Sequence, residues 1–485
     1  MISRKFLSSS IIYSGIGSLP LASSFILLPF YTNYLSTSDY GLLALYLSIS
    51  LLVQILVNFA LDTTIGIHYF EFRDDQAKLR SFIGTIAGLL LVVGLLFALL
   101  SAGIGNIFFS KIFPNNDLKF YPYGFLAVLT GIFNSYFKTY INLLINQERP
   151  ARYFWMNITI FALTIILTLA GLYFYPHSLI GPLGARFVAG LLIFVATIFF
   201  FKTEFDISIK VSFLKGLFVF CLPVFLYFII AWILSFADRF IIKAYMEASD
   251  VGIYDFIVKC TLIIDFVLNG LSSAITPKVY KILKEMKLNE STVEMNRYFN
   301  GFTIVTLFMV PLLVLIIPVV IPLIVTRKDY YAGFPFVGIL CLGFLARALH
   351  LMYLIPIYYF KKTARLPVIL FLSATLQIGF TIMGIKEFGL MGAVWANFLS
   401  RPIQVLFLFL FSRNIFQFRF NKSKLIYLPL FYIILNLFCY FIFRNEHLVF
   451  VSLCQLIIVY AAVVVVFRKE IPVFVGEVKR SSYFS

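Results

Sequence analysis

Long apolar runs constrain this chain more than any other feature of its sequence. A helix that crosses a bilayer needs about 20 mainly apolar residues, and runs of that length recur throughout the chain. Of the 485 residues, 61% are hydrophobic and 13% are charged. A soluble protein with this composition could not cover its core with polar surface. The chain is therefore predicted to be an all-α integral membrane protein.

Fourteen apolar segments are candidates for transmembrane helices. They cover residues 9–35, 42–69, 82–104, 121–145, 154–176, 180–201, 216–242, 252–275, 299–325, 333–360, 366–385, 389–411, 425–443 and 448–467. The five cysteines lie within these segments. They are expected to be small core residues without disulfide bonds.

The distribution of Lys and Arg predicts the orientation of the chain. With a cytoplasmic N-terminus, 26 of these residues lie in inside segments and 7 in outside segments. Cytoplasmic segments of membrane proteins are rich in Lys and Arg, so both termini are predicted to be cytoplasmic. The same bias accounts for most of the net charge of +17. No nucleic-acid partner is expected.

An internal repeat organises the predicted helices. Residues Tyr34–Gly41 resemble Tyr245–Gly252 at an offset of 211, and Gly181–Ala185 resemble Gly389–Ala393 at an offset of 208. Each copy would hold six helices, and an even number gives two parallel repeats, or lobes, around a central cavity. Two extra C-terminal helices would follow. The predicted domains are an N-terminal lobe at 1–210, a C-terminal lobe at 211–412, and helices thirteen and fourteen with a cytoplasmic tail at 413–485.

The segments between the helices argue against an enzyme. The longest loop is predicted at Pro277–Tyr298, as an amphipathic cytoplasmic segment between the halves. No Walker loop, dinucleotide fingerprint or zinc-ligand spacing is found. The four histidines lie far apart in the sequence, so neither a metal site nor a cofactor is expected.

Ten charged residues fall within the predicted spans. A charge at the centre of a bilayer costs about 2.5–3.5 kcal/mol, so these side chains must face a partner, an interface or a water-filled cavity. The basic ones are Lys138, Arg186, Arg239, Lys259, Arg347 and Arg401, and the acidic ones are Asp62, Asp238, Asp255 and Asp265. The excess of cations favours an anionic substrate, and the Arg side chain suits phosphate.

Polar residues at helical spacing suggest where such a cavity would lie. Gln54, Asn58 and Asp62 share one helix face, as do Asn134, Lys138, Asn142 and Asn146 on another helix. The candidate substrate-binding residues are Lys138, Arg347, Arg401, His350, Asn397, Gln404, Arg186 and Lys259. Hydrogen bonds that hold the helices together are the alternative explanation for these stripes.

The acidic residues have two possible roles. Asp62, Asp265 and Asp255 are candidates either to carry a coupling ion or to neutralise a neighbouring cation. H⁺ and Na⁺ both stay open as the coupling ion. Asp238 and Arg239, near the outer end of the seventh helix, would pair with each other or reach the interface.

Several motifs resemble those of the O-antigen and polysaccharide flippases, which share a superfamily with multidrug extruders and lipid II flippases. They are Leu28–Gly41, Leu61–Phe70, and the block containing Asp238, Arg239, Gly252 and Tyr254. The resemblance implies a protein that moves an undecaprenyl-diphosphate-linked oligosaccharide across the bacterial cytoplasmic membrane by alternating access. It also implies that Lys138, Arg347 and Arg401 contact the diphosphate or acidic sugars. The Asp238 to Tyr254 block is expected to be structural.

The implied partners are the lipid-linked oligosaccharide, membrane lipids, and the polymerase and chain-length proteins of the same pathway. Two other functions stay open. A multidrug exporter of the same fold would prefer acidic cavity residues for cationic drugs. A membrane-embedded polysaccharide polymerase or ligase would need a sizeable outer loop, and the predicted outer loops are short.

Overall fold

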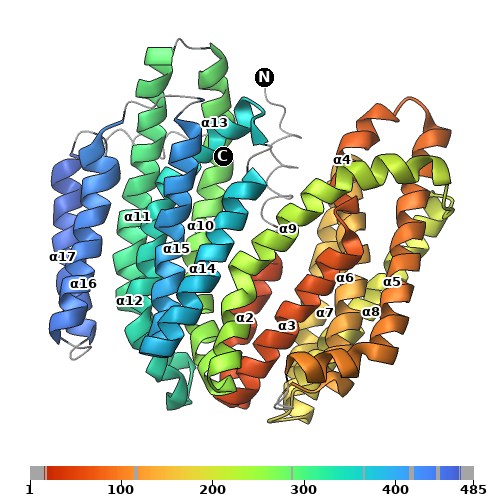
Figure 1. Cartoon of the computed structure of the whole chain (residues 1–485), viewed down its shortest axis with the longest axis horizontal. Helices are drawn as coiled ribbons and strands as arrows, with labels where there is room; N and C mark the ends of the chain where they lie inside the picture. Colours follow the sequence, from red (N-terminus) through yellow and green to blue (C-terminus); the bar gives the residue numbers. More distant parts are fainter. Residues whose placement is uncertain are drawn as a thin grey trace. The chain divides into compact units, whose positions relative to one another are not determined.

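The apolar runs fold into helices. The computed structural model describes residues 16, 19–113, 118–285, 288–363, 366–413, 415, 420–443, 448–468 and 470. All regular secondary structure in these residues is helical (Figure 1). The predicted class, an all-α integral membrane protein, is confirmed.

The helices belong to two compact units, which divide between Gly252 and Ile253. The helices of the first unit are α2 (Leu19–Tyr34), α3 (Thr37–Asn58), α4 (Leu61–Glu71), α5 (Gln76–Ile112), α6 (Phe125–Asn146), α7 (Pro150–Phe174), α8 (Ile180–Glu204) and α9 (Val211–Tyr245). A π-helical turn, η1 (Phe120–Gly124), precedes α6.

The second unit begins within helix α10, at Ile253. Its helices are α10 (Ala248–Glu285), α11 (Leu288–Ile324), α12 (Phe334–Leu342), α13 (Arg347–Tyr359), α14 (Leu366–Phe388), α15 (Leu390–Ser412), α16 (Leu428–Phe443) and α17 (Leu448–Val466). Short turns described in this unit include the 3₁₀ turns η2 (Lys328–Gly333) and η3 (Gly343–Ala346) and the π-helical turn η5 (Ser423–Tyr427).

Every predicted transmembrane segment overlaps one of these helices or an almost continuous pair of them. Eleven segments in the described residues are long and apolar enough to cross a membrane. Helices α2, α6 and α10 lie outside that set. Of these, α2 is described over only 16 residues, and α6 and α10 carry ionisable residues within their predicted spans.

The second predicted span is broken into α3 and α4. Phe59 and Ala60 have φ angles of 46° and 61°, in the left-handed region, and the backbone N–H of Phe59 closes the end of α3 by bonding to the Ile55 carbonyl. Helix α4 then begins at Leu61. The predicted continuous stripe of Gln54, Asn58 and Asp62 is therefore wrong, because Asp62 lies beyond the break.

The first repeat motif forms a close helix crossing. A Cβ atom on Gly41 of α3 would lie 2.0 Å from the Ala248 carbonyl oxygen, and one on Gly252 of α10 would lie 1.9 Å from the Thr37 carbonyl oxygen. Thr37 and Ala248 are themselves 211 residues apart. The contact is thus reciprocal, as expected where two related copies of one motif meet.

The aspartates of the same motif organise the starts of these two helices. The Asp39 backbone N–H donates to Ser36 Oγ over 3.0 Å, and Ser36 Oγ donates to Asp39 Oδ2 over 2.6 Å. In the second copy, the Glu247 backbone N–H donates to Asp250 Oδ2 over 3.1 Å. Both arrangements satisfy N–H groups that a helix start leaves unpaired. The repeated residues Asp and Gly therefore have structural roles.

The second repeat motif is also a glycine contact, with a corrected register. A Cβ atom on Gly181 of α8 would lie 2.4 Å from the Gly171 carbonyl oxygen of α7, and one on Gly392 of α15 would lie 2.0 Å from that of Gly384 of α14. These contacts pair Gly181 with Gly392, at an offset of 211. The offset of 208, which paired Gly181 with Gly389, is wrong by about one helical turn.

The predicted loop at 277–298 is largely helical. Helix α10 continues to Glu285 with Pro277 inside it, and α11 begins at Leu288. Charged residues on these extensions form exposed pairs within one helix, such as Arg297 with Glu294 over 2.9 Å. Hydropathy marks where the apolar span ends, and a helix can continue beyond that point.

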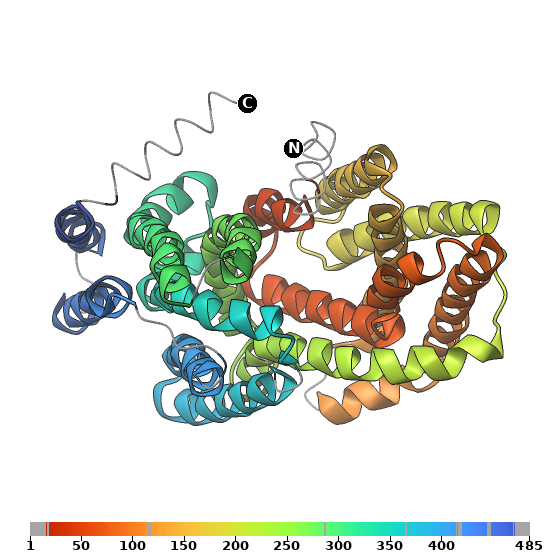
Figure 2. The same ribbon diagram turned by 90° about the horizontal axis from the view of Figure 1, so that it is seen from above.

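Helices α16 and α17 lie side by side at the end of the second unit (Figure 2). Inside this pair, Asn436 Nδ2 donates to Gln455 Oε1 over 3.0 Å, and both side chains are buried. Tyr460 of α17 donates to the Phe308 carbonyl oxygen of α11 over 2.8 Å. Polar bonds of this kind join helices in an apolar environment. The predicted domain boundaries at 210 and 412 stay a prediction.

Candidate functional site

A cationic cluster lies inside the second unit, on helices α10, α13 and α15. Arg347 Nη2 donates to Asn269 Oδ1 over 2.8 Å. The Arg401 guanidinium lies over the Phe344 ring, 4.0 Å from its centroid, and interacts electrostatically with Asp265 and Arg347. Two guanidiniums and one carboxylate therefore belong to this group, which leaves it with a net positive charge.

A local irregularity makes room for this cluster. The 3₁₀ turn η3 separates α12 from α13 and ends at Ala346, directly before Arg347. At the start of the turn, a Cβ atom on Gly343 would lie 2.7 Å from Arg401 Cδ. The absence of a side chain at Gly343 lets the Arg401 stem pack against the turn.

His350 is the third basic residue of this group. It lies one helical turn from Arg347 on α13 and interacts electrostatically with both arginines. Among the described residues, no ion pair within 4.0 Å joins Arg347 or Arg401 to a carboxylate. The cluster therefore retains donors that can bind an anion.

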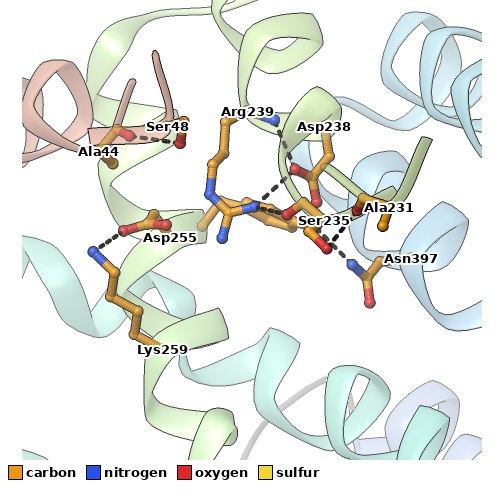
Figure 3. A network of polar contacts seen from close by, with 10 residues as sticks. Ala44, Ser48, Ala231, Ser235, Asp238, Arg239, Asp255, Lys259 and Asn397 are labelled. Carbon is orange, nitrogen blue, oxygen red and sulfur yellow. Dashed lines mark hydrogen bonds and ion pairs between the residues drawn. The ribbon is translucent and has the colours of Figure 1, made fainter. Parts of the chain in front are cut away.

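The remaining predicted residues of the second unit are Asn397, Lys259 and Gln404. Asn397 Nδ2 donates to Tyr254 Oη over 3.2 Å, and Lys259 Nζ pairs with Asp255 Oδ2 over 2.7 Å (Figure 3). Gln404 is half-buried on α15. Lys259 and Asp255 both lie on α10 and carry opposite charges, so the pair adds no net charge.

A second polar group lies inside the first unit, between α4 and α6. Lys138 Nζ lies 3.2 Å from Asp62 Oδ2, and Asn142 Nδ2 donates to the same oxygen over 2.8 Å. Asn58, at the end of α3, donates to Thr139 Oγ1 over 2.9 Å. Polar residues of α6 thus contact both parts of the broken span: Thr139 bonds to α3, and Lys138 and Asn142 bond to α4.

Arg186 of α8 makes one long hydrogen bond. Its Nη2 donates to the hydroxyl of Tyr31 over 3.4 Å. Its Nε atom is buried and has no hydrogen-bond partner within the described part of the chain. Arg186 is therefore less completely satisfied than the paired cations Lys138 and Lys259.

Asp238 and Arg239 form an ion pair in α9 (Figure 3). Arg239 Nη1 donates to Asp238 Oδ1 over 2.9 Å and to the Ser235 carbonyl oxygen over 2.7 Å. The two side chains are only 6% and 2% exposed. The sequence leaves open whether these side chains pair with each other or reach the interface. In the structure they pair with each other.

Two features of these polar groups are not among the predictions from sequence patterns. Asn269, the partner of Arg347, lies 211 residues after Asn58. Both asparagines bond to a later helix of their own half, at Arg347 of α13 and at Thr139 of α6. The repeat offset was the signal for Asn269, whereas the α3–α4 break has no Gly or Pro to mark it.

No group of three or more His, Cys, Asp or Glu side chains within the described ranges could hold a metal ion. The polar side chains described above can offer a ligand hydrogen bonds and charge. The cluster around Arg347 and Arg401 suits the binding of an anion, whereas Lys138, Arg239 and Lys259 are each paired with a carboxylate.

The fold and these polar groups define a polytopic all-α membrane protein, and comparison with known proteins identifies the family. Residues 6–283 match the family described as polysaccharide biosynthesis protein. This match covers more than half of the chain. The chain belongs to the polysaccharide biosynthesis protein family, and the resemblance predicted from its motifs is confirmed.

A protein of the Lsg locus of Haemophilus influenzae is 22% identical over 274 residues, which are 54% of this chain and 63% of that protein. The chain thus matches less than two thirds of that relative's length. Among solved structures, lipid II flippase MurJ in an inward closed conformation matches with a TM-score of 0.75 and 14% identity, over 96% of this chain and 100% of that one.

An inward-facing multidrug resistance MATE family transporter matches with a TM-score of 0.63 and 14% identity, over 80% of this chain and 96% of that one. The MATE multidrug transporter DinF-BH matches with a TM-score of 0.58 and 15% identity, over 86% of this chain and 97% of that one. At these sequence identities, the structural similarities establish the fold but not the substrate.

Proposed function

We propose that this protein is a flippase that moves an undecaprenyl-diphosphate-linked oligosaccharide across the bacterial cytoplasmic membrane. Membership of the polysaccharide biosynthesis protein family supports the substrate class. The observation that carries the proposal is the cationic cluster of Arg347 and Arg401, which lies within apolar helices and lacks a matching set of carboxylates. Intramembrane ionisable groups of this kind mark substrate pathways.

The arginines would bind the diphosphate. A guanidinium presents its donors as a planar fork that fits two phosphate oxygens, and Asn269 already orients that of Arg347. His350, Asn397 and Gln404 would donate to or accept from sugar hydroxyls. Arg186, Lys259 and Lys138 are proposed as further cations along the path.

Transport would involve no covalent chemistry. The two predicted lobes, 1–210 and 211–412, would alternate between inward-open and outward-open states, with helices from 413 onward outside the repeat. Both termini would be cytoplasmic, and the polymerase and chain-length proteins of the pathway would receive the product. Asp62, Asp255 and Asp265 are the proposed groups for charge compensation or for coupling to H⁺ or Na⁺.

A multidrug exporter is the second candidate, because the chain shares its fold with MATE transporters. A cationic drug would require an uncompensated carboxylate in the membrane. Asp62, Asp238 and Asp255 are each paired with a cation, and Asp265 interacts with Arg401. The charges therefore favour the anionic substrate.

The proposal is tested in the native host after deletion of the gene. Lipid-linked oligosaccharides are extracted, and their leaflet is determined with a reagent that cannot cross the membrane. Accumulation of complete units on the cytoplasmic face, with loss of the surface polymer, is the expected result. Single units on the outer face would instead indicate a polymerase or ligase, and sensitivity to cationic drugs without lipid-linked intermediates would indicate an exporter.

Complementation then tests the site. Plasmids that encode Arg347→Ala or Arg401→Ala should fail to restore the surface polymer, although the proteins reach the membrane. Arg297→Ala is the matched control, because Arg297 lies on the α11 extension with its side chain 69% exposed. This variant should restore the polymer fully.

A further inference from the structure

The Asp62–Lys138 pair differs from the other intramembrane ion pairs in how unequally its two members are exposed. The Asp62 side chain is 3% exposed and the Lys138 side chain 39%. In the pair of Asp255 and Lys259, the lysine is 19% exposed. Part of the Lys138 side chain is therefore open to a ligand, while the Asp62 side chain is covered.

The α3–α4 break fixes Asp62 as a buried anion. Asp62 lies in the first turn of α4, where the positive end of the helix dipole favours negative charge. Asn142 of α6 donates to its carboxylate over 2.8 Å. The carboxylate thus keeps two stabilising neighbours, the helix start and Asn142, that do not depend on Lys138.

The ammonium group of Lys138 has more N–H donors than its contact with Asp62 uses. An ammonium group carries three N–H donors, and Asp62 is its one carboxylate partner among the ion pairs of the described residues. Its Nζ also lies 5.1 Å from the centre of the Phe228 ring of α9. An aromatic face attracts a cation without neutralising it. Lys138 can therefore turn toward a ligand that carries more negative charge than one carboxylate.

We propose that Lys138 exchanges one anionic partner for another. Its ammonium group leaves Asp62 to bind the phosphate groups of the substrate, and it pairs with Asp62 again when the substrate departs. This inference rests on the proposed function and adds a second phosphate-binding position in the first unit. Moving Lys138 leaves Asp62 buried without its cation, which has a cost. Asp62 thereby weakens the binding of phosphate and promotes its release, as transport requires binding that is weak enough to be reversed.

The exchange has a direct consequence for affinity. Asp62→Asn removes the competing charge and keeps a side chain of the same size beside Asn142. Binding of a diphosphate lipid should then become about tenfold tighter, the equivalent of about 1.4 kcal/mol. Lys138→Gln should weaken binding by a similar factor. The double variant should bind like Lys138→Gln alone, because the carboxylate acts only through the lysine.

The measurement uses the purified full chain in phosphatidylcholine nanodiscs, with undecaprenyl diphosphate as the probe and native mass spectrometry as the readout. Lys281→Gln is the matched control, because Lys281 is 72% exposed on the α10 extension, and its affinity should equal that of the unaltered chain. Competition by inorganic pyrophosphate or by phosphatidylglycerol shows whether free phosphate or a phospholipid headgroup also satisfies the site. Thermal unfolding confirms that each variant is folded.

Weaker or unchanged binding in a folded Asp62→Asn variant would overturn the exchange. So would an unchanged affinity in Lys138→Gln. If Arg347→Gln weakens binding while both of these variants behave like the unaltered chain, the inference fails and the proposed function stands. If neither the unaltered chain nor Lys281→Gln binds the diphosphate lipid, the proposed function fails and the inference fails with it.

Discussion

The reciprocal crossing of α3 and α10 should not tolerate a single methyl group. Gly41→Ala would place a Cβ atom 2.0 Å from the Ala248 carbonyl oxygen, and Gly252→Ala would place one 1.9 Å from the Thr37 carbonyl oxygen. Both obstacles are backbone atoms of helices, so neither can rotate away. The helices must separate if either glycine is replaced.

The size of the effect follows from that separation. A carbon atom approaches a carbonyl oxygen to about 3.3 Å at closest, so the helices must move apart by more than about 1 Å. Overpacking in a well-packed interior costs about 1–3 kcal/mol when side chains can adjust. Since only backbone can move here, we expect a loss of about 3 kcal/mol for Gly41→Ala.

Thermal unfolding in detergent measures this loss. The thiols of Cys221, Cys260 and Cys341 are buried and free, so a thiol-reactive fluorescent dye reports when the chain opens. At about 2 °C or less for each kcal/mol in a chain of this size, Gly41→Ala should lower the unfolding temperature by about 5 °C.

Gly270→Ala is the matched control. Gly270 lies on the same helix, α10, and a Cβ atom there would meet nothing within 4 Å, so its unfolding temperature should not fall. The double variant Gly41→Ala/Gly252→Ala should lose less stability than the sum of the two single variants, because one separation relieves both clashes. An unfolding temperature for Gly41→Ala equal to that of Gly270→Ala would refute the reasoning.

Three further predictions concern polar contacts, each measured by thermal unfolding. Asp238→Ala should cost about 3–5 kcal/mol, because it removes the carboxylate that pairs with the buried charge of Arg239; a shift of less than about 1 °C would contradict this. The coupling of Asn436 with Gln455, from a double-mutant cycle with alanine, should be about 0.6–1.7 kcal/mol, and additive single effects would argue against the bond. Lys281→Ala removes a pair that is exposed on both sides and should change stability by less than about 0.5 kcal/mol.

The positions of the helices could be predicted because a membrane leaves little choice. Each span must contain about 20 apolar residues and satisfy its own backbone, so hydropathy alone located the segments. It could not locate the break after Asn58, since Phe59 and Ala60 are apolar residues that rarely adopt a left-handed conformation. Packing of α3 and α4 against the neighbouring α6 holds that break.

The repeat was visible in the sequence, but its physical role was not. Matching letters gave offsets of 211 and 208, whereas the glycine contacts give 211 in both places. The glycines of Gly181–Ala185 are three residues apart, so identity alone could not decide which one faces the neighbouring helix. The close approach to Gly171 selects Gly181, and a Cβ atom on Gly184 would meet nothing within 4 Å.

Part of the candidate site could be predicted from charge. A charged residue in an apolar span stands out by its transfer cost, and this identified Lys138, Arg347 and Arg401. Their partners could not be assigned, because Asp62 and Asn269 lie about 80 residues away from the side chains they contact. Such pairings depend on how the helices pack, which periodicity within one helix does not specify.

Reconstituted transport tests the central claim most directly. Lipid-linked oligosaccharide from the deletion strain, labelled on its sugar, is placed in both leaflets of liposomes, and an impermeant reagent then modifies the sugar from outside. With the unaltered protein, nearly all of the label should become accessible, whereas empty liposomes and Arg347→Ala should leave the inner half protected. Protection of half of the label with the unaltered, folded protein would contradict the account.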